Sequence, residues 1–271
     1  MSRTLLIDAD IVAYKFASTS EEVHYFDGAD DAPAVKADLD HATSQARYYI
    51  EELQESLGAD KIIVCLSDPD ANFRKTLSPT YKLSRVGTRK PEDLMRVKEW
   101  MATAYMTYQR PALEADDCMG ILSTHPTLVR GEKIIVSEDK DMQGIPGTLF
   151  NPAKDKEPRR IGKLSADRYH LWQTIVGDSC DGYPGAKGIG PKSPEAIGVL
   201  AAKTVEEAWG FVLQAYERSI SRREDIPADQ LPLVIAQDAV LQARLARILR
   251  ATDWDFTRKA PRLWVPPSIS H

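Results

Sequence analysis

The sequence predicts an α/β fold in which a parallel sheet is flanked by helices and followed by a helical C-terminal part. Three short apolar runs carry this prediction, "TLLID" (4–8), "KIIVCLSD" (61–68) and "EKIIVSED" (132–139). Each is rich in β-branched residues or leucine and ends in aspartate, as is typical of buried parallel strands that finish at a polar sheet edge. Helical patterns lie between and after these runs, so the strands are expected to alternate with helices and to lie parallel.

Residue periodicity places the other elements. Apolar residues recur every three or four positions from Val35 to Leu57, which predicts a helix, and Gly58 marks its C-terminal stop. The segment 220–236 is polar and is expected to be a loop. A weak strand is expected at 104–109. Five further helices are expected at 115–124, 164–178, 191–203, 204–219 and 238–252, and Pro191 opens the third of them. The predicted domains are therefore an α/β domain over residues 1–163 and a helical region over residues 164–271.

Composition limits the class of protein. The chain has 271 residues, of which 43% are hydrophobic, with ordinary numbers of glycine and proline, and this indicates a globular protein. No apolar stretch approaches the roughly 20 residues of a membrane helix, so no membrane partner is expected. The three cysteines, Cys65, Cys118 and Cys180, are odd in number and widely spaced, which indicates reduced thiols in a cytoplasmic setting.

Carboxylates gather at five places, each near the end of a predicted strand or helix. A single aspartate is more often a turn or capping residue, and Asp10 is interpreted in this way. Nine acids at one sheet edge, however, would repel one another unless cations neutralised them. Carboxylate oxygens in this number suit two Mg²⁺ or Mn²⁺ ions about 4 Å apart, the arrangement that displaces phosphate esters. The candidate metal ligands are Asp8, Asp68, Glu114, Asp116, Asp117, Asp139, Asp141, Asp178 and Asp181.

Two segments indicate nucleic-acid binding. Residues 74–98 contain eight Lys and Arg against two acids, with Tyr81 among them, which fits gripping a nucleic-acid backbone and stacking a base. The turn 182–190 has four glycines and precedes a helix, as in helix–hairpin elements that hold duplex DNA through its phosphates. The candidate DNA contacts are Arg74, Lys75, Tyr81, Arg89, Lys90, Gly185, Lys187, Gly188, Gly190 and Lys192.

The net charge of −5 is compatible with such a partner. Without the nine clustered acids, 35 basic residues face 31 acidic ones, a balance of +4. Two divalent ions at the acids would also add four positive charges. Because the local field matters more than the total charge, an acidic protein of this kind can offer phosphates a positive surface.

The motifs resemble, in their order along the chain, those of a known family. The motifs are "LIDAD", "LSD", "RKTLSPTYKLSR", "LEADD", "SEDKD" and "GDSCDGYPGAKGIGPK". They are similar to the 5′ nucleases, which include flap endonucleases and the 5′→3′ exonucleases of bacteria and phages. The resemblance covers roughly residues 4–200 and is strongest to the exonucleases of short-tailed DNA phages. One small departure is Asp8-Ala9, where many relatives have Asp-Gly, and it leaves the ligand intact.

The resemblance implies a PIN-like fold, an arch-like basic segment at 74–98, a helix–three-turn–helix DNA element near 181–203 and two-metal hydrolysis of phosphodiesters. One ion would lower the pKa of the attacking water and the other would stabilise the leaving 3′ oxygen. Lys82 and Arg85 match the catalytic basic residues that act on the scissile phosphate. By motif position, the first metal would be bound by Asp8, Asp68, Glu114 and Asp116, and the second by Asp139, Asp141, Asp178 and Asp181, with Asp117 near both.

The resemblance also implies the biological setting. The expected activity is 5′→3′ exonuclease with flap endonuclease and RNA-primer removal, on duplex DNA with a 5′ end, on a 5′ flap and on RNA–DNA hybrids. The product is expected to retain a 5′-phosphate. A K⁺ ion is expected at the helix–three-turn–helix element. The expected state is a monomer in the cytoplasm, that of the host if the chain is phage-encoded.

Two alternatives stay open. "LLIDADIV" also fits a haloacid-dehalogenase-type phosphatase, with Asp8 as nucleophile and Asp10 as acid/base, although this leaves the basic segment without a role. The other alternative is a nuclease-like protein that has lost catalysis and only binds DNA ends. Such a protein is expected to lack metal-binding acids, whereas this sequence has the full set.

Overall fold

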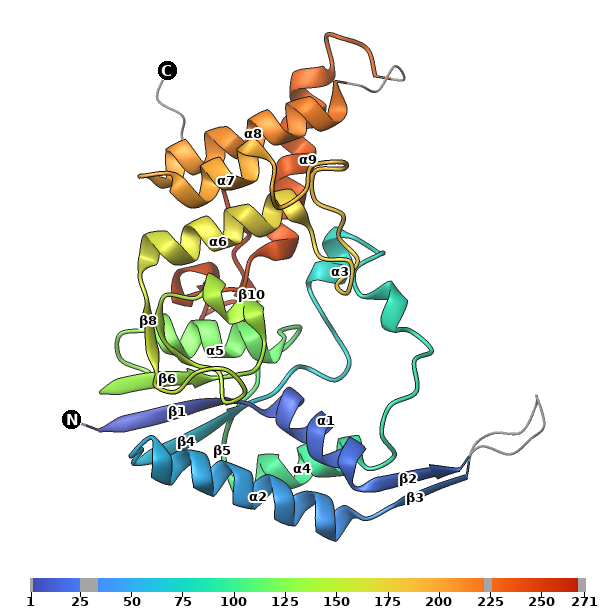
Figure 1. Cartoon of the computed structure of the whole chain (residues 1–271), viewed down its shortest axis with the longest axis vertical. Helices are drawn as coiled ribbons and strands as arrows, with labels where there is room; N and C mark the ends of the chain where they lie inside the picture. Colours follow the sequence, from blue (N-terminus) through green and yellow to red (C-terminus); the bar gives the residue numbers. More distant parts are fainter. Residues whose placement is uncertain (1, 25–33, 222–225, 268–271) are drawn as a thin grey trace.

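A six-stranded sheet forms the centre of the computed structural model, which describes residues 2–24, 34–221 and 226–267 (Figure 1). The strand order is β5-β4-β1-β6-β7-β8, and only β7 and β8 pair antiparallel. The strands are β1 (Arg3–Asp8), β4 (Lys61–Cys65), β5 (Met106–Tyr108), β6 (Glu132–Val136), β7 (Gly147–Phe150) and β8 (Arg159–Ile161). The predicted parallel sheet is confirmed, including its weak strand. Sequence patterns missed β7 and β8 because neither contains a long apolar run.

Helices cover both faces of the sheet (Figure 1). Alternate residues of β1 point to opposite faces: Leu5 and Ile7 join one buried core, and Leu6 joins the other. All three side chains are fully buried, so the position of Asp8 at the end of β1 is fixed by packing on both sides. The helices of the first core are α1 (Ala9–Thr19), α2 (Leu39–Ser56) and α4 (Leu94–Ala104), and that of the second is α5 (Ala115–Thr124).

In the N-terminal third, the start of one predicted helix is wrong, and the sequence patterns predicted neither α1 nor the pair of strands that precedes α2. The helix expected from Val35 begins at Leu39, because the Asp38 carboxylate caps α2 by accepting the His41 N–H at 2.9 Å. Val35 instead lies in β3 (Ala34–Ala37), which pairs antiparallel with β2 (Glu21–His24). Gly58 follows the end of α2 with φ of 59°, as the predicted stop requires.

Four helices follow the sheet and pack around a separate core that includes Trp209 and Tyr216 (top of Figure 1). They are α6 (Lys163–Val176), α7 (Pro194–Ala201), α8 (Val205–Ile220) and α9 (Leu231–Ala246). α7 begins at Pro194 rather than at Pro191, because the Ser193 side chain caps it. α9 begins inside the predicted loop, since proline is tolerated in a first helical turn, and it ends earlier than expected. The boundary at residue 163 stays a prediction.

The chain after α9 returns to the sheet and packs on α5. Leu249 and Trp254 are buried in the same core as α5. Gly120 of α5 faces the carbonyl group of Leu249 so closely that a Cβ atom there would collide with backbone. The short elements of this return are a 3₁₀ turn (Ala251–Asp253), β9 (Trp254–Asp255) and β10 (Ala260–Pro261).

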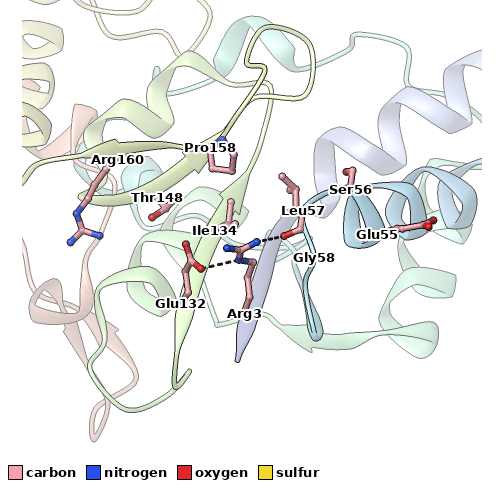
Figure 2. A pocket seen from close by; sticks show the side chains of 10 residues that line it. All are labelled: Arg3, Glu55, Ser56, Leu57, Gly58, Glu132, Ile134, Thr148, Pro158 and Arg160. Carbon is pink, nitrogen blue, oxygen red and sulfur yellow. Dashed lines mark hydrogen bonds and ion pairs between the residues drawn. The ribbon is translucent and has the colours of Figure 1, made fainter. Parts of the chain in front are cut away.

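The amino ends of the parallel strands form one edge of the sheet, and a shallow hollow opens there (Figure 2). Arg3 crosses this hollow, with its Nε 2.8 Å from a carboxylate oxygen of Glu132, and it also donates to the carbonyl group of Leu57 (Figure 2). Arg3 therefore ties β1 and β6 to the C-terminal end of α2, where a cation is favourable. Within the described ranges, no helix is long and apolar enough to span a bilayer.

Replacing Gly120 with alanine tests the docking of the C-terminal return on α5. We expect Gly120→Ala to lower the free energy of unfolding by about 1–3 kcal/mol, because backbone must shift to admit the methyl group. The matched control is Gly210→Ala in α8, where an added Cβ meets nothing and the better helix former should stabilise by about 0.5–1 kcal/mol. Urea denaturation of both variants checks this, and equal effects would contradict the docking.

Candidate active site

The carboxyl ends of the parallel strands meet at one edge of the sheet, and a cavity of about 380 Å³ opens there. Strand β1 ends at Asp8, the segment after β6 supplies Asp139, and the start of α5 supplies Glu114. Eight carboxylates line the cavity, from Asp8, Asp10, Glu114, Asp116, Asp139, Asp141, Asp178 and Asp181. Seven of them are predicted metal ligands, so the fold brings together acids that lie far apart in the sequence.

Two of the predicted ligands do not line this cavity. The Asp68 carboxylate accepts N–H groups of Asp70 at 3.0 Å and Ala112 at 2.6 Å, and these bonds lower its pKa. The buried Asp117 carboxylate is held by both terminal nitrogens of Arg74 at 2.8 Å. In this arrangement Asp68 closes a turn and Asp117 anchors α5, and their role as metal ligands stays a prediction.

Burial and mutual repulsion raise the pKa values of several cavity acids. Asp8 is 2% exposed, and burial followed by the charge of Asp10 raises its pKa to about 7. Burial and the neighbouring Asp139 raise the pKa of Asp141 to about 6. Burial and then Asp8 raise the pKa of Asp116 well above its usual range. The cavity therefore favours either protons or cations among its carboxylates.

Hydrogen bonds fix the orientation of Asp8. The Ser137 hydroxyl group donates to its carboxylate at 2.7 Å, and the Ile11 N–H donates to it at 3.2 Å. The same carboxylate thereby caps α1, which begins at the next residue. A strand end and a helix start thus share one side chain, so Asp8 cannot shift without disturbing both elements.

Lys82 and Arg85, the predicted catalytic cations, both point into the cavity. The Lys82 ammonium group pairs closely with Glu114 and lies 3.6 Å from Asp181, and Arg85 lies 2.6 Å from Asp181. Burial disfavours the charge of Glu114, but Lys82 and Arg74 outweigh it and lower its pKa to about 2.

The loop that carries Asp178 and Asp181 is pressed against the Lys82 segment by close backbone contacts. Gly182 has φ of 75° and leaves room for the Thr80 carbonyl group, and the Lys82 N–H donates to the Asp181 carbonyl group at 2.8 Å. At the base of the loop, Gly177 and Gly185 touch backbone to backbone. A side chain at these glycines would push the loop acids away from Lys82.

Three of the residues that the sequence predicts to contact DNA are buried in this structure. Arg74 is 2% exposed and also donates to the carbonyl groups of Leu245 and Arg247. Tyr81 is 3% exposed, and its single hydroxyl proton is shared between two cavity carboxylates within hydrogen-bond distance, so the ring cannot stack on a base in this arrangement. The Gly185 N–H is buried and donates to the side chain of another residue. A basic run in sequence does not reveal which of its members turn inward.

The other predicted DNA contacts lie at the surface. Arg89 pairs with Glu21 at 2.7 Å, and its side chain is 38% exposed. The six others, all exposed, are Lys75, Lys90, Lys187, Gly188, Gly190 and Lys192. Those from Lys187 onward lie immediately before α7.

Three charged residues near the cavity are not among the predicted site residues, although Asp10 is a helix-start residue as expected. Asp10 lines the cavity, and Lys98 of α4 lies 2.8 Å from the Asp10 carboxylate. Lys140 lies 3.2 Å from Asp178. The position of Lys140 between two predicted ligands could have indicated its place. Lys98 offers no such signal, because only the packing of α4 brings it to α1.

Comparison with known sequences gives a consistent result. Residues 3–151 match the family described as 5′–3′ exonuclease, N-terminal resolvase-like domain. The chain is 30% identical to the exodeoxyribonuclease of Enterobacteria phage T3 and 28% identical to the exonuclease of Escherichia phage T7, each across 97% of this chain and 93% of the relative. It is 31% identical to flap endonuclease Xni of a Shewanella strain, across 49% of this chain and 54% of that protein.

Solved structures share the fold. A bacteriophage T5 protein co-crystallised with metal ions superposes with a TM-score of 0.56 at 16% identity, covering 91% of this chain and 89% of that one. A complex of the T5 flap endonuclease with DNA and metal ions gives a TM-score of 0.51 at 16% identity, covering 88% and 99%. Because the matched family region spans more than half of the chain, and phage exonucleases align with nearly all of it, this protein belongs to the 5′–3′ exonuclease family.

Proposed function

We propose that this chain hydrolyses DNA phosphodiester bonds from 5′ ends with two divalent cations held by its cavity carboxylates. The observation that carries the proposal is the gathering of seven predicted acid ligands with Lys82 and Arg85 in one cavity. The DNA and metal ions of the T5 flap endonuclease complex support the same class of substrate and cofactor. Family membership sets aside the phosphatase alternative.

The donor set fits hard divalent cations such as Mg²⁺ or Mn²⁺, which prefer carboxylate oxygens. Burial and the neighbouring carboxylates raise the pKa values of Asp8 and Asp116, and a cation there would replace protons. In the part of the chain that the structure describes, no three acidic, histidine or cysteine side chains already form a metal site. We assign Asp8, Glu114 and Asp116 to the first ion, and Asp139, Asp141, Asp178 and Asp181 to the second.

When bound, the two cations supply a water of lowered pKa and a counter-charge for the leaving 3′ oxygen. The side chains of this protein supply orientation and charge. The Tyr81 hydroxyl group joins Glu114 at 2.9 Å to Asp181 at 3.2 Å, and so links carboxylates of the two groups. Lys82 and Arg85 would then offset the charge that builds on the phosphate. The expected product keeps its 5′-phosphate.

The surface turn before α7 is proposed to hold duplex DNA as a helix–three-turn–helix element near 181–203. Lys187 and Lys192 offer charge, and Gly188 and Gly190 allow close approach of backbone to a phosphate. A K⁺ ion at this element stays an expectation. Lys75 and Lys90 are proposed to contact the DNA backbone beside the cavity. The proposed substrates also include 5′ flaps and RNA–DNA hybrids, and the proposed state is a monomer.

Asp178→Asn is expected to abolish cleavage and to leave DNA binding measurable, because it removes a metal ligand and little surface. Cleavage of 5′-labelled duplex in Mg²⁺ and fluorescence anisotropy with the same DNA in chelator measure the two properties. The control is Asp40→Asn on the exposed first turn of α2, which should keep full activity. Full activity in Asp178→Asn would contradict the metal assignment.

Lys82→Ala is expected to lower the cleavage rate at saturating DNA about 10²- to 10³-fold while changing the DNA Kd only a few-fold. Lys75→Ala replaces an exposed residue of the same segment and should have the opposite effects on rate and binding. It should leave that rate unchanged, weaken binding and reduce the salt dependence of binding by about one charge. Single-turnover rates and salt titrations separate the two, and identical profiles for both variants would count against a catalytic Lys82.

Without divalent ions, the free energy of unfolding is expected to fall as pH rises from about 4 to about 7. The pKa values of Asp8 and Asp141 are raised from 3.8 to about 7 and about 6, so the folded state holds protons that the unfolded state has released. Each group contributes a slope of at most about 1.4 kcal/mol per pH unit. Denaturation in chelator at several pH values across this range tests the expectation. Asp8→Asn should make the free energy of unfolding less dependent on pH. A rise in stability over the same range would refute the expectation.

A further inference from the structure

The carboxylate of Asp10 joins the start of α1 to α4. Its Oδ1 lies 2.8 Å from the Lys98 ammonium group, and the two side chains are only 26% and 21% exposed. Val97, next to Lys98, is fully buried in the core that α1 shares with α4, so packing already fixes the backbone on both sides of the pair. A partly buried pair between fixed backbones loses little side-chain entropy on forming, unlike an ion pair between exposed, flexible side chains.

The same carboxylate also reaches the helix that carries Glu114 and Asp116. The Ser67 N–H donates to Asp10 Oδ1 at 3.4 Å, and the Ser67 hydroxyl group accepts the N–H of Ala115, the first residue of α5, at 3.0 Å. Asp10 therefore contacts α5 through a single intervening residue. It lies where the starts of α1 and α5 and one face of α4 converge.

The basic segment 74–98 ends on α4, as Figure 1 shows in teal on the side of the molecule. Its near end is held at the cavity by Lys82 and Arg85. Its far end is held by two acids that flank α1: Asp10 at the start of the helix holds Lys98, and Glu21, just after the helix, holds Arg89. Glu21 also accepts the N–H of Glu92 at 2.9 Å, so the far end is fixed at several points.

We propose that Asp10 and Lys98 are a positioning pair for the nuclease reaction. Their ion pair sets the distance between the α5 carboxylates and the basic segment that brings Lys82 to the phosphate. Asp10 acts through Ser67 and Lys98, and touches neither metal nor DNA. The inference rests on the proposed function, because it concerns the alignment of that same site.

Loss of the pair should reduce the rate of the chemical step rather than the binding of DNA, because the contacts with the DNA backbone remain and only their alignment with the acids is lost. Lys98→Met and Asp10→Asn are each expected to lower kcat on 5′-labelled duplex about tenfold, with KM changed less than about twofold. The double variant should be no slower than either single variant, because both remove one shared interaction. Lys98→Arg should restore most of the rate.

The control is Arg262→Met, which removes a cation from an exposed ion pair with Asp255, outside the basic segment. It should leave kcat and KM unchanged. Electron paramagnetic resonance titration with Mn²⁺ supplies a readout independent of activity. Asp10→Asn should bind the same number of ions as the parent chain, with affinity changed less than about threefold.

Several outcomes would overturn the inference. Loss of a Mn²⁺ ion in Asp10→Asn would make Asp10 a ligand instead. Additive losses in the double variant, or an equal loss in Arg262→Met, would show that the pair has no specific role. Full activity of Lys98→Met in an active parent chain would overturn this inference alone, whereas a parent chain inactive on every DNA substrate would overturn the proposed function.

Discussion

Mutual repulsion among eight carboxylates in one cavity is the constraint on which the rest of this structure depends. Folding must hold these groups together before any cation arrives. Burial, followed by the charges of neighbouring carboxylates, raises the pKa values of Asp8 and Asp141, and this reflects the cost. The cost is offset by rigid surroundings. Strand β1 is buried on both faces, the Ser137 hydroxyl group fixes Asp8, and Lys82 neutralises Glu114. The same constraint explains why a divalent cation is the natural occupant.

Arg74 links α5, which lies beside the cavity, to the C-terminal part of the chain. Its guanidinium group binds Asp117 of α5 and the carbonyl groups of Leu245 and Arg247, and the Leu249 N–H donates to Asp117 at 2.9 Å. The helix that supplies cavity acids is thereby clamped to the segment that follows α9. Both members of such a buried charge pair must keep their partners, because an unpaired buried charge would lower the free energy of unfolding. Alignment of the catalytic edge therefore depends on residues more than 100 positions away in sequence.

The sequence was most informative where one local pattern decides the structure. The strand that ends in Asp8, the strand that leads to Asp139 and the helix at 115–124 follow from apolar runs and a helix start. The seven cavity acids follow from their places near element ends. Prediction failed where tertiary packing decides. Arg74 and Tyr81 belong to a basic run yet turn inward, because buried carboxylates require partners. Asp10 reads as an ordinary helix-start residue until α4 brings Lys98 to it. The start of α9 was missed because proline favours a loop in sequence but is allowed in a first helical turn.

The central claim is that the carboxylate cavity degrades DNA from the 5′ end with divalent metal. The most direct test compares linear duplex labelled at one 5′ end with duplex labelled at a 3′ end, each with Mg²⁺ and with chelator, beside a 5′-flapped substrate. The account predicts early release of short 5′-labelled products and gradual shortening of 3′-labelled strands, both only with metal. No cleavage of any of the three substrates, or cleavage that persists in chelator, would contradict it.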